Sequence, residues 1–332
     1  MQTCRIWDDG HIPALGLGCW AIGGPWTAGG TAAGWGVVDD AESQRAIHAA
    51  VGAGVRFFDT AQAYGAGHSE TVLGQALRGQ GDVRVATKVG LAIDPANRML
   101  TGPDITPAAI TASIDASLTR LQRPCIDLAL LHLNSLPVSD ADGVFDTLET
   151  LRTAGKITAY GWSTDFPDRA AAFAARPGMV AIEHAMNVFF RADALMPVIA
   201  AHGLLSINRS PLAMGLLGGK YAGGVAFGAQ DVRSQNADWM AYFRDGQVSP
   251  AFARQLAAVR DLLQTGGRSL AQGAIGWLWA RADNTLPIPG FRTVAQVNDL
   301  AGALAHGPLP AHVMTQIEAV IVREPEGPPR DR

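Results

Sequence analysis

The sequence has few cysteines, no long apolar run and no cluster of charge of one sign. Cys4, Cys19 and Cys125 are an odd number of thiols at unrelated spacings, which fits neither a disulfide framework nor a zinc site. No apolar segment approaches the roughly 18 residues that a membrane span needs, and the N-terminus lacks the basic and apolar regions of a secretion signal. These absences predict a cytoplasmic protein with no membrane segment.

Charge is sparse and nearly balanced. The 332 residues include 26 basic and 30 acidic side chains, scattered without long runs, for a net charge of -4. This distribution argues against nucleic-acid and anionic-membrane partners and favours a small, neutral-to-anionic ligand. With 48% hydrophobic and 17% charged residues, the chain can bury a large core. The composition leaves open whether the protein is a monomer or a homo-oligomer.

Short β-type runs alternate with longer helical patterns over most of the chain. Such alternation is typical of a parallel sheet with crossover helices, and eight strands are the number that closes a TIM barrel. We therefore predict an α/β fold, a (β/α)₈ barrel, as a single domain over residues 1–322. The predicted strands are Leu15–Trp20, Arg56–Asp59, Val83–Lys88, Leu128–His132, Ala159–Ser163, Val180–Glu183, Leu204–Asn208 and Leu286–Ile288.

Amphipathic patterns between these strands predict the helices. Several begin at a Ser, Thr or Asp cap, and Pro107 follows Thr106 as a proline at a first helical position. The predicted helices include Ser43–Ala53, Ser69–Leu77, Pro107–Leu121, Phe145–Ala154 and Val294–Leu304.

Four segments fall outside this alternation. Asp9 and Gly10, between short apolar runs, predict a β-hairpin that closes the bottom of the barrel. Residues 20–40 and 212–250 are predicted to be long βα loops, which in a barrel lie over the active face. Residues 323–332 are rich in proline and charge, which predicts a disordered tail.

Four polar side chains lie at or just after consecutive predicted strand ends. Asp59 ends the second strand, Tyr64 follows in a glycine-rich turn, and Lys88 and His132 end the third and fourth strands. Taken singly, such an Asp is more often a turn cap, and such a Tyr or His is more often a packed structural residue. Because parallel strand ends open on one mouth of a barrel, the four side chains are expected to converge. Their joint occurrence favours a catalytic site.

The order Asp59, Tyr64, Lys88, His132 resembles the catalytic tetrad of the aldo-keto reductase superfamily, in particular its bacterial members with long barrel loops. The resemblance extends over nearly the whole chain, through LGLGCW, FFDTAQAYG, ATKVG, LLHLN, LRTAGKITAYGWST, NRSPLAMGLLGGKY and IPGFRTVAQV. It implies an NADP-dependent oxidoreductase that reversibly reduces an aldehyde or ketone to an alcohol with NADPH. It implies no metal.

The resemblance makes Tyr64 the proton donor to the reduced carbonyl oxygen. A tyrosine, with a reference pKa near 10, becomes a usable acid when a nearby cation stabilises its phenolate. We expect Lys88 to be that cation and to lower the pKa of the phenol. Asp59 would hold Lys88 in place, and His132 would hydrogen-bond to the substrate carbonyl and orient it.

On the cofactor side, the sequence matches the family in part. Ser163 matches a serine that contacts the nicotinamide amide, whereas Thr164 and Glu183 stand where relatives commonly have Asn and Gln. An ionised Glu can accept from the amide nitrogen but cannot donate to the amide oxygen. Arg209 replaces an aromatic residue that stacks on the nicotinamide, and a planar guanidinium can stack similarly.

The adenosine end of the resemblance lies at a predicted helix start. Arg292 and Thr293 there suit a phosphate dianion, which favours NADPH over NADH. Gln296 matches the adenine-side motif, and Leu300 replaces its usual Asn. The complete set of predicted cofactor residues is Trp20, Asp59, Ser163, Thr164, Glu183, Arg209, Ser210, Pro211, Leu212, Gly215, Lys220, Gly290, Arg292, Thr293, Gln296 and Leu300.

The predicted substrate pocket is aromatic, which favours a bulky or aromatic carbonyl over a small charged sugar. Two other functions remain open at this point. One is an NADPH-binding regulatory or sensor subunit with little turnover, and the other is a reductase of specialised metabolism that acts on a biosynthetic ketone or imine. The predicted substrate residues are Trp20, Tyr64, His132, Asn134 and Trp35, with Trp26 equally well explained by loop packing.

Overall fold

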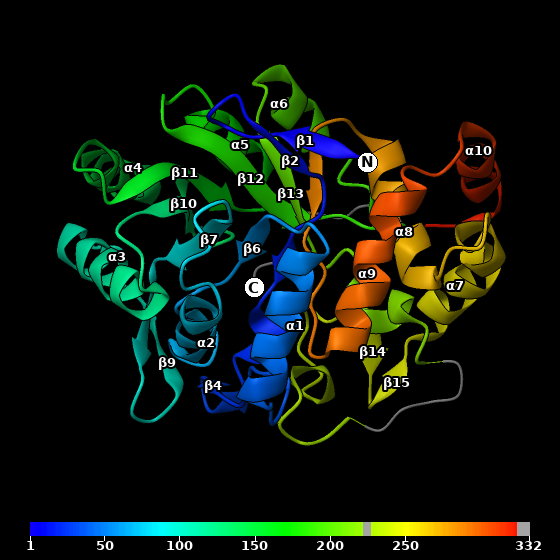
Figure 1. Cartoon of the computed structure of the whole chain (residues 1–332), viewed down its shortest axis with the longest axis horizontal. Helices are drawn as coiled ribbons and strands as arrows, with labels where there is room; N and C mark the ends of the chain where they lie inside the picture. The colour runs from blue at the N-terminus through cyan, green and yellow to red at the C-terminus, as the bar shows by residue number, and fades with distance from the viewer. Residues whose placement is uncertain (222–226, 324–332) are drawn as a thin grey trace.

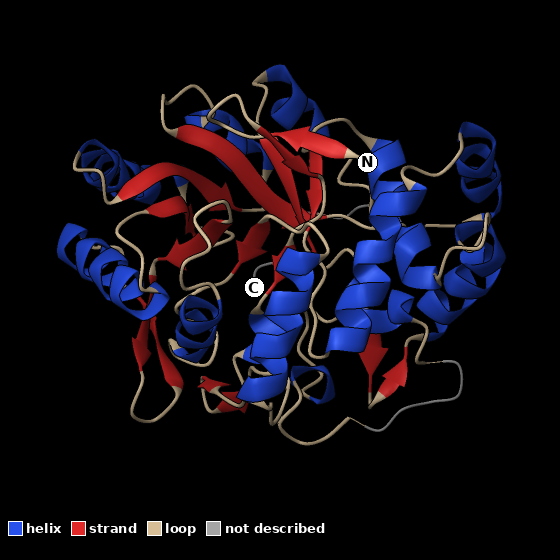
Figure 2. Ribbon diagram, viewed as in Figure 1, coloured by secondary structure: helices blue, strands red, loops and turns tan. Residues whose placement is uncertain are grey.

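Eight parallel strands form the central sheet of the protein (Figures 1 and 2). The computed structural model describes residues 1–221 and 227–323. The strands follow one another around the sheet in chain order, and each corresponds to one of the eight predicted strands. They are β3 (Leu17–Gly18), β6 (Phe57–Asp59), β7 (Arg84–Val89), β10 (Ile126–Leu131), β11 (Ile157–Ser163), β12 (Met179–Ala185), β13 (Leu205–Arg209) and β16 (Thr285–Pro287).

The sheet closes between its first and last strands. The backbone nitrogens of Gly16 and Gly18 donate to the carbonyl oxygens of Pro287 and Pro289, each over 3.0 Å. A Cβ atom on Gly18 would lie 2.9 Å from the carbonyl oxygen of Ile288, so glycine allows the two strands to meet. The (β/α)₈ barrel predicted from the sequence is therefore confirmed.

Helices surround the barrel. Eight of them follow the strands, namely α1 (Asp40–Gly52), α2 (His68–Ala76), α3 (Pro107–Leu121), α4 (Val138–Thr153), α5 (Pro167–Phe173), α6 (Met196–Ala201), α8 (Leu270–Arg281) and α9 (Val294–His306). Two further helices, α7 (Pro250–Leu263) and α10 (Ala311–Val320), lie beside α8 at one side of the molecule (Figure 1). None of the helices in the described part of the chain is long and apolar enough to cross a membrane.

Local capping sets several helix starts. The Thr106 side chain accepts from the backbone nitrogen of Ala109, and α3 has the bounds that the sequence predicted. By contrast, α4 begins at Val138, seven residues before the predicted Phe145. Its first turns contain polar residues and Gly143, which weaken the apolar pattern, yet Ala141 and Val144 are buried. Packing against the barrel therefore extends the helix beyond its sequence signal.

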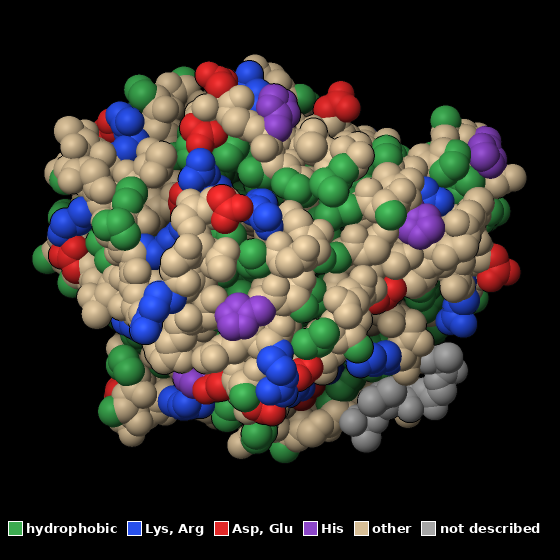
Figure 3. All heavy atoms as spheres, viewed as in Figure 1, with side chains coloured by type: hydrophobic (Ala, Val, Ile, Leu, Met, Phe, Trp, Pro, Cys, Tyr) green, Lys and Arg blue, Asp and Glu red, His purple; other side chains and the backbone are tan. Residues whose placement is uncertain are grey.

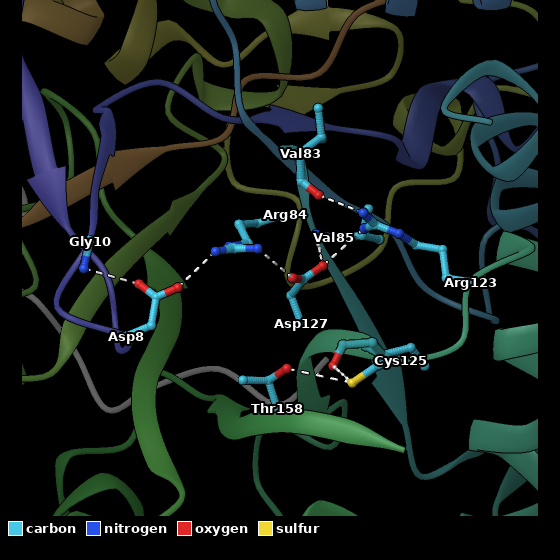
Figure 4. Close-up of polar contacts among 10 residues, drawn as sticks. Asp8, Gly10, Val83, Arg84, Val85, Arg123, Cys125, Asp127 and Thr158 are labelled. Carbon is cyan, nitrogen blue, oxygen red and sulfur yellow. Dashed lines mark hydrogen bonds and ion pairs between the residues drawn. The ribbon is translucent and has the colours of Figure 1, made fainter. Parts of the chain in front are cut away.

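The N-terminal hairpin lies at the bottom of the barrel, as predicted. β1 (Thr3–Arg5) pairs antiparallel with β2 (His11–Pro13). Arg84, at the start of β7, donates to Asp8 over 2.7 Å, and it also pairs with Asp127, as Figure 4 shows. These contacts tie the hairpin to the N-terminal ends of the strands, opposite the predicted site.

The two predicted long loops are present and touch each other. The backbone nitrogen of Val232 donates to the carbonyl oxygen of Gly34 over 2.8 Å, and Trp35 forms a bridge with Asp231. The later loop contains η2 (Ala213–Gly218), η3 (Val232–Ser234), β14 (Phe243–Arg244) and β15 (Gln247–Val248).

A small sheet over the barrel was not predicted. Its strands are β4 (Thr27–Ala28), β5 (Thr31–Ala32), β8 (Leu91–Asp94) and β9 (Met99–Pro103), in the order β5-β4-β9-β8. It joins the first long loop to an excursion after β7. Strands of two residues leave no periodic signal, because pairing between distant loops holds them in place.

The predicted tail falls largely outside the described residues, which end at Arg323. Arg323, the first residue of that segment, donates from its Nε to the carbonyl oxygen of Val188 over 2.8 Å, and its Nη atoms bond both carboxylate oxygens of Glu318. On the face shown in Figure 3, acidic and basic side chains are interspersed and the hydrophobic ones form small separate groups.

Candidate active site

The four predicted catalytic residues come together at the C-terminal end of the barrel. Asp59 is the last residue of β6 and Lys88 lies near the end of β7. His132 follows directly after β10, and its backbone nitrogen donates to the carbonyl oxygen of Val89 over 2.8 Å. Tyr64 lies in the turn between β6 and α2.

Glycine holds the turn of Tyr64 in position. Gly65 has a φ of 67°, a conformation that side chains with Cβ rarely adopt. A Cβ atom there would overlap with the carbonyl oxygen of Gly23, and one on Gly23 would lie 2.9 Å from the carbonyl carbon of Tyr64. Glycine at positions 23 and 65 therefore allows the two loop backbones to pack directly together. This packing fixes Tyr64 relative to the first long loop.

Lys88 is the centre of the polar site. Its Nζ lies 2.5 and 2.6 Å from the two carboxylate oxygens of Asp59 and 3.3 Å from the hydroxyl oxygen of Tyr64. It also donates to the carbonyl oxygen of Thr60 over 3.0 Å. Although burial by itself lowers the pKa of Lys88, the carboxylates of Asp59 and Glu183 raise it on balance, so the side chain is an ammonium.

The pKa of Tyr64 depends on burial as well as on the charge of Lys88. Burial raises the pKa of Tyr64, and Lys88 lowers it by less than burial and the nearby carboxylates raise it. Lys88 thus lowers the pKa of the phenol as expected, but the desolvation that the expectation left out outweighs this effect. The tyrosine is therefore a neutral phenol that can donate a proton. Lys88 makes it a stronger acid than burial alone would leave it.

His132 is a neutral imidazole. Burial, and then the charges of Lys88 and Arg209, hold the pKa of His132 well below its usual range. Its ring meets the ring of Tyr64 edge to face, with centroids 5.8 Å apart. A neutral imidazole beside the phenol can donate one hydrogen bond to an oxygen placed between them.

Aromatic side chains from both long loops form a wall beside Tyr64. The Trp20 ring lies nearly parallel to that of Tyr64, with centroids 5.9 Å apart, and contacts Trp35 edge to face at 5.4 Å. Trp239, which the sequence analysis missed, lies 6.4 Å from Trp20. In the sequence, only the position of Trp239 in the second long loop pointed to the site. Trp26 is buried with Ala61 and Ala63, in a cluster against which Trp20 and Tyr64 also pack.

Asn134 and Thr164, predicted near substrate and cofactor, bond to each other and to their surroundings. The Thr164 hydroxyl donates to the carbonyl oxygen of Asn134 over 2.6 Å. The Asn134 side-chain oxygen accepts from the backbone nitrogen of Asp165 over 2.7 Å. Both residues are buried, and these bonds fix the loops after β10 and β11 relative to each other.

Arg209 pairs with an acidic residue that the sequence analysis did not single out. Its Nη2 lies 2.5 Å from Oδ2 of Asp165, whose Oδ1 accepts from the backbone nitrogen of Ala185. Asp165 follows Ser163 and Thr164 directly after β11, so its position at a strand end was the available signal. The guanidinium of Arg209 is thereby held close to the mouth of the barrel.

Glu183 faces Lys88. Its Oε2 lies 3.2 Å from Nζ of Lys88, and its Oε1 accepts from the hydroxyl of Ser163 over 3.1 Å. The sequence placed Ser163 and Glu183 at the cofactor amide. The structure brings them together and adds a direct contact between Glu183 and Lys88.

The predicted phosphate loop has an unusual backbone. Ser210, Ala213 and Met214 have φ angles of 54°, 49° and 55°, and Gly215 has a φ of 92°. Clustered left-handed residues of this kind usually occur where a site constrains the chain. Of the remaining predicted residues in this loop, Pro211 is buried, Leu212 is partly buried and Lys220 is exposed.

At the start of α9, the predicted phosphate ligands have protein partners. The guanidinium of Arg292 donates to the carbonyl oxygens of Trp35 and Val37. Thr293 caps the helix by accepting from the backbone nitrogen of Gln296. The backbone nitrogen of Val294 donates to the carboxylate of Glu42 over 2.9 Å.

Two further predicted cofactor residues lie at either end of this region. Gly290 bridges to Gly18 where the barrel closes. Leu300 is only 3% exposed and packs in the hydrophobic core. Burial of Leu300 explains an apolar residue where relatives commonly have Asn.

Comparison with known proteins places this geometry in a family. The model of the aldo/keto reductase family matches residues 14–322. The chain is 29% identical to the aldo-keto reductase YhdN of Bacillus subtilis over 311 residues, 91% of this chain and 88% of that protein. It belongs to the aldo/keto reductase family and is an oxidoreductase of that family.

Solved structures agree with the fold. The glycerol dehydrogenase AKR11B4 from Gluconobacter oxydans superposes with a TM-score of 0.80 at 29% identity, covering 98% of both chains. An aldo-keto reductase from Klebsiella pneumoniae, solved in complex with NADPH, superposes with a TM-score of 0.69 at 23% identity, covering 98% of this chain and 96% of that one.

Proposed function

We propose that the protein reduces an aldehyde or ketone to an alcohol with NADPH, reversibly, with Tyr64 as the general acid. The observation that carries the proposal is the buried chain of contacts from Asp59 through Lys88 to the Tyr64 hydroxyl, with His132 edge-on to the phenol. NADPH, when bound, supplies the hydride. The arrangement offers a proton and a hydrogen bond to the same carbonyl oxygen.

Each residue has a distinct part in this proposal. Tyr64 transfers its proton to the oxygen that becomes the alcohol. His132, as a neutral donor, polarises that oxygen and holds it next to the phenol. Lys88 stabilises the phenolate left behind, and Asp59 holds Lys88 within reach of it. Because these groups are buried, their electrostatic effect is stronger than it would be in water.

The structure offers groups that fit a dinucleotide. The left-handed residues Ser210, Ala213, Met214 and Gly215 lie in a turn of the kind that binds anionic groups through backbone N–H groups. The start of α9 provides a helix N-terminus next to Arg292. Residues that would hold the cofactor are Trp20, Asp59, Ser163, Thr164, Glu183, Arg209, Ser210, Pro211, Leu212, Gly215, Lys220, Gly290, Arg292, Thr293 and Gln296.

NADPH, like the cofactor in the Klebsiella pneumoniae neighbour, is favoured by Arg292 and the helix start. A 2′-phosphate at this point must compete with the carboxylate of Glu42 for the backbone nitrogen of Val294. It must also compete with two loop carbonyls for Arg292. We propose that the phosphate displaces these partners, because a dianion binds a guanidinium more strongly than a carbonyl does.

The aromatic wall supports a bulky or aromatic carbonyl substrate. Trp20 lies next to Tyr64, and Trp35 and Trp239 both contact Trp20. Aromatic rings bind planar apolar groups better than small hydrated ones. A substrate panel that contains benzaldehyde and glyceraldehyde separates this proposal from a small polyol activity, such as the Gluconobacter oxydans relative's name describes.

To test the proposal, the protein is mixed with NADPH and each substrate of this panel, and the consumption of NADPH is followed by absorbance. Tyr64→Phe is expected to lower kcat/KM by about 10²- to 10⁴-fold, with NADPH still bound. Tyr160→Phe is the matched control, because Tyr160 is a buried tyrosine on β11 that packs on Phe145 away from the site. Tight NADPH binding without turnover of any carbonyl overturns the proposal and favours a sensor subunit.

A further inference from the structure

Two buried carboxylates surround a single buried cation in the active site. Lys88 lies 2.5 Å from Asp59 and 3.2 Å from Glu183, and the side chains of all three are at most 4% exposed. Glu183 comes from β12, which is separated from β7 in the sheet by β10 and β11. The contact therefore crosses the interior of the barrel, where water cannot screen the charges.

Lys88 has more acceptors than protons. Its ammonium has three N–H bonds, and these face both oxygens of Asp59, the carbonyl of Thr60, the hydroxyl of Tyr64 and Oε2 of Glu183. That Oε2 atom is fully buried and receives no well-directed hydrogen bond from the part of the chain that the structure describes. An ionised oxygen in this position would be poorly compensated.

The other charged and titratable groups near Glu183 do not offset this excess of negative charge. Arg209 is paired with Asp165 across the barrel mouth. His132 is neutral, and burial raises the pKa of the Cys19 thiol, which is therefore also neutral. The hydroxyl of Ser163 donates to Oε1 of Glu183 but carries no charge. The titratable groups that interact with one or both carboxylates are Lys88, Tyr64, Cys19 and His184.

We propose that Asp59 and Glu183 together hold one proton beside Lys88 at neutral pH, and that this proton restores Tyr64 after each reduction. The proposal rests on the reductase function proposed above. Two like charges beside a single buried cation repel each other strongly, which favours one proton shared between the two carboxyl groups. In agreement, burial and then the charge of Glu183 raise the pKa of Asp59 well above its usual range.

The proposed path moves one proton from a donor to an acceptor at each step. The Tyr64 O–H bond breaks as the proton passes to the alcohol oxygen. The phenolate then takes a proton from Nζ of Lys88, 3.3 Å away, and the neutral amine takes the shared proton of the carboxyl pair, whose Glu183 oxygen lies 3.2 Å away. The pair is reprotonated from solvent before the next turnover. Glu183 thus acts through Lys88 and is a positioning and proton-holding residue.

The first test is infrared spectroscopy of the free protein at neutral pH. The wild type is expected to show a carboxylic-acid C=O band that disappears on unfolding, because a free Asp or Glu, with a pKa near 4, is ionised at this pH. Glu183→Gln, which keeps the side-chain shape, is expected to lack the band. Absence of the band in the folded wild type overturns the proposal, whether or not any variant folds.

Asp127→Asn is the matched control for this measurement. Asp127 is a mostly buried carboxylate at the opposite end of the barrel, where it pairs with Arg84 and Arg123 and accepts from Val85 (Figure 4). Because Arg84 and Arg123 both pair with this carboxylate, replacing Asp127 is expected to leave the band in place. Loss of the band in Asp127→Asn, with the band retained in Glu183→Gln, assigns the proton elsewhere and overturns the proposal.

The second test separates a proton source from a general structural role. In Glu183→Gln, the ratio of the later-turnover rate to the first-turnover rate is expected to fall about 10²-fold relative to the wild type, because Tyr64 begins protonated and only later turnovers need the shared proton. Equal slowing of first and later turnovers overturns the proposal. If the wild type shows the band but reduces no carbonyl, the proposed reductase function fails and the shared proton stands.

Discussion

The guanidinium of Arg209 lies 2.5 Å from the carboxylate of Asp165 and joins the end of β13 to the loop after β11. Both side chains are mostly buried, with 16% and 7% exposed. The pair lies where we propose that the nicotinamide binds, so it would give that region a fixed pair of charged side chains. The contribution of this pair to the free energy of unfolding can be measured separately from its effect on binding.

Arg209→Met is expected to lower the free energy of unfolding by about 3 kcal/mol, because it leaves Asp165 buried without its cation. Urea denaturation monitored by tryptophan fluorescence measures this change. Lys156→Met is the control: Lys156 forms an exposed pair with Asp115, and such pairs contribute less than about 1 kcal/mol. Equal losses in the two variants would contradict the role assigned to Asp165.

Glu42→Gln is expected to strengthen NADPH binding about fivefold and to leave NADH binding unchanged. The variant removes a negative charge from the backbone nitrogen of Val294 at the start of α9, where the 2′-phosphate is proposed to bind. Fluorescence titration with each nucleotide at low salt measures the effect. Asp40→Asn is the control, because it removes the same charge from the same helix although Asp40 bonds His68. A general effect of net charge therefore appears in both variants, and an effect at Val294 appears only in Glu42→Gln.

Gly65→Ala is expected to lose both stability and activity. Alanine must adopt a φ of 67° and also overlaps with the backbone of Gly23, so we expect a loss of at least about 2 kcal/mol. Gly79→Ala provides the comparison, since Gly79 has a φ of 80° with open space around it and costs only about 1 kcal/mol. Thermal unfolding and turnover of both variants distinguish strain from loss of the close approach.

His184 links stability to pH. Burial lowers the pKa of His184 to about 4, whereas an unfolded histidine has a pKa near 6.5. The unfolded chain therefore binds the extra proton as pH falls from 7 toward 4, and the stability that the neutral ring contributes is lost over that range. Between pH 7 and 5 this single site costs roughly 2 kcal/mol of unfolding free energy.

Accordingly, His184→Gln is expected to show a smaller loss of stability between pH 7 and 5 than the wild type, by roughly that amount. Urea denaturation at the two pH values measures the difference. His202→Gln, at an exposed position, is expected to behave like the wild type. A pH dependence that is the same in all three proteins would contradict the assignment to His184.

The sequence by itself determined the barrel and most of the tetrad geometry. Six of the eight predicted strands end in a polar residue, and parallel strands in chain order bring those ends to one mouth. Asp59, Lys88 and His132 therefore met because of signals that are local to three segments. Tyr64 needed only the turn that follows Asp59.

Only the tertiary structure decided which groups surround those residues. Glu183 reaches Lys88 across the barrel, Trp239 reaches Trp20 from another loop, and the small sheet pairs segments about 70 residues apart in sequence. The net direction of the Tyr64 pKa depends on burial, which no local motif reports. Contacts between distant segments and the desolvation that they cause arise only on closure of the barrel, so they set the electrostatics of a site whose residues the sequence had already named.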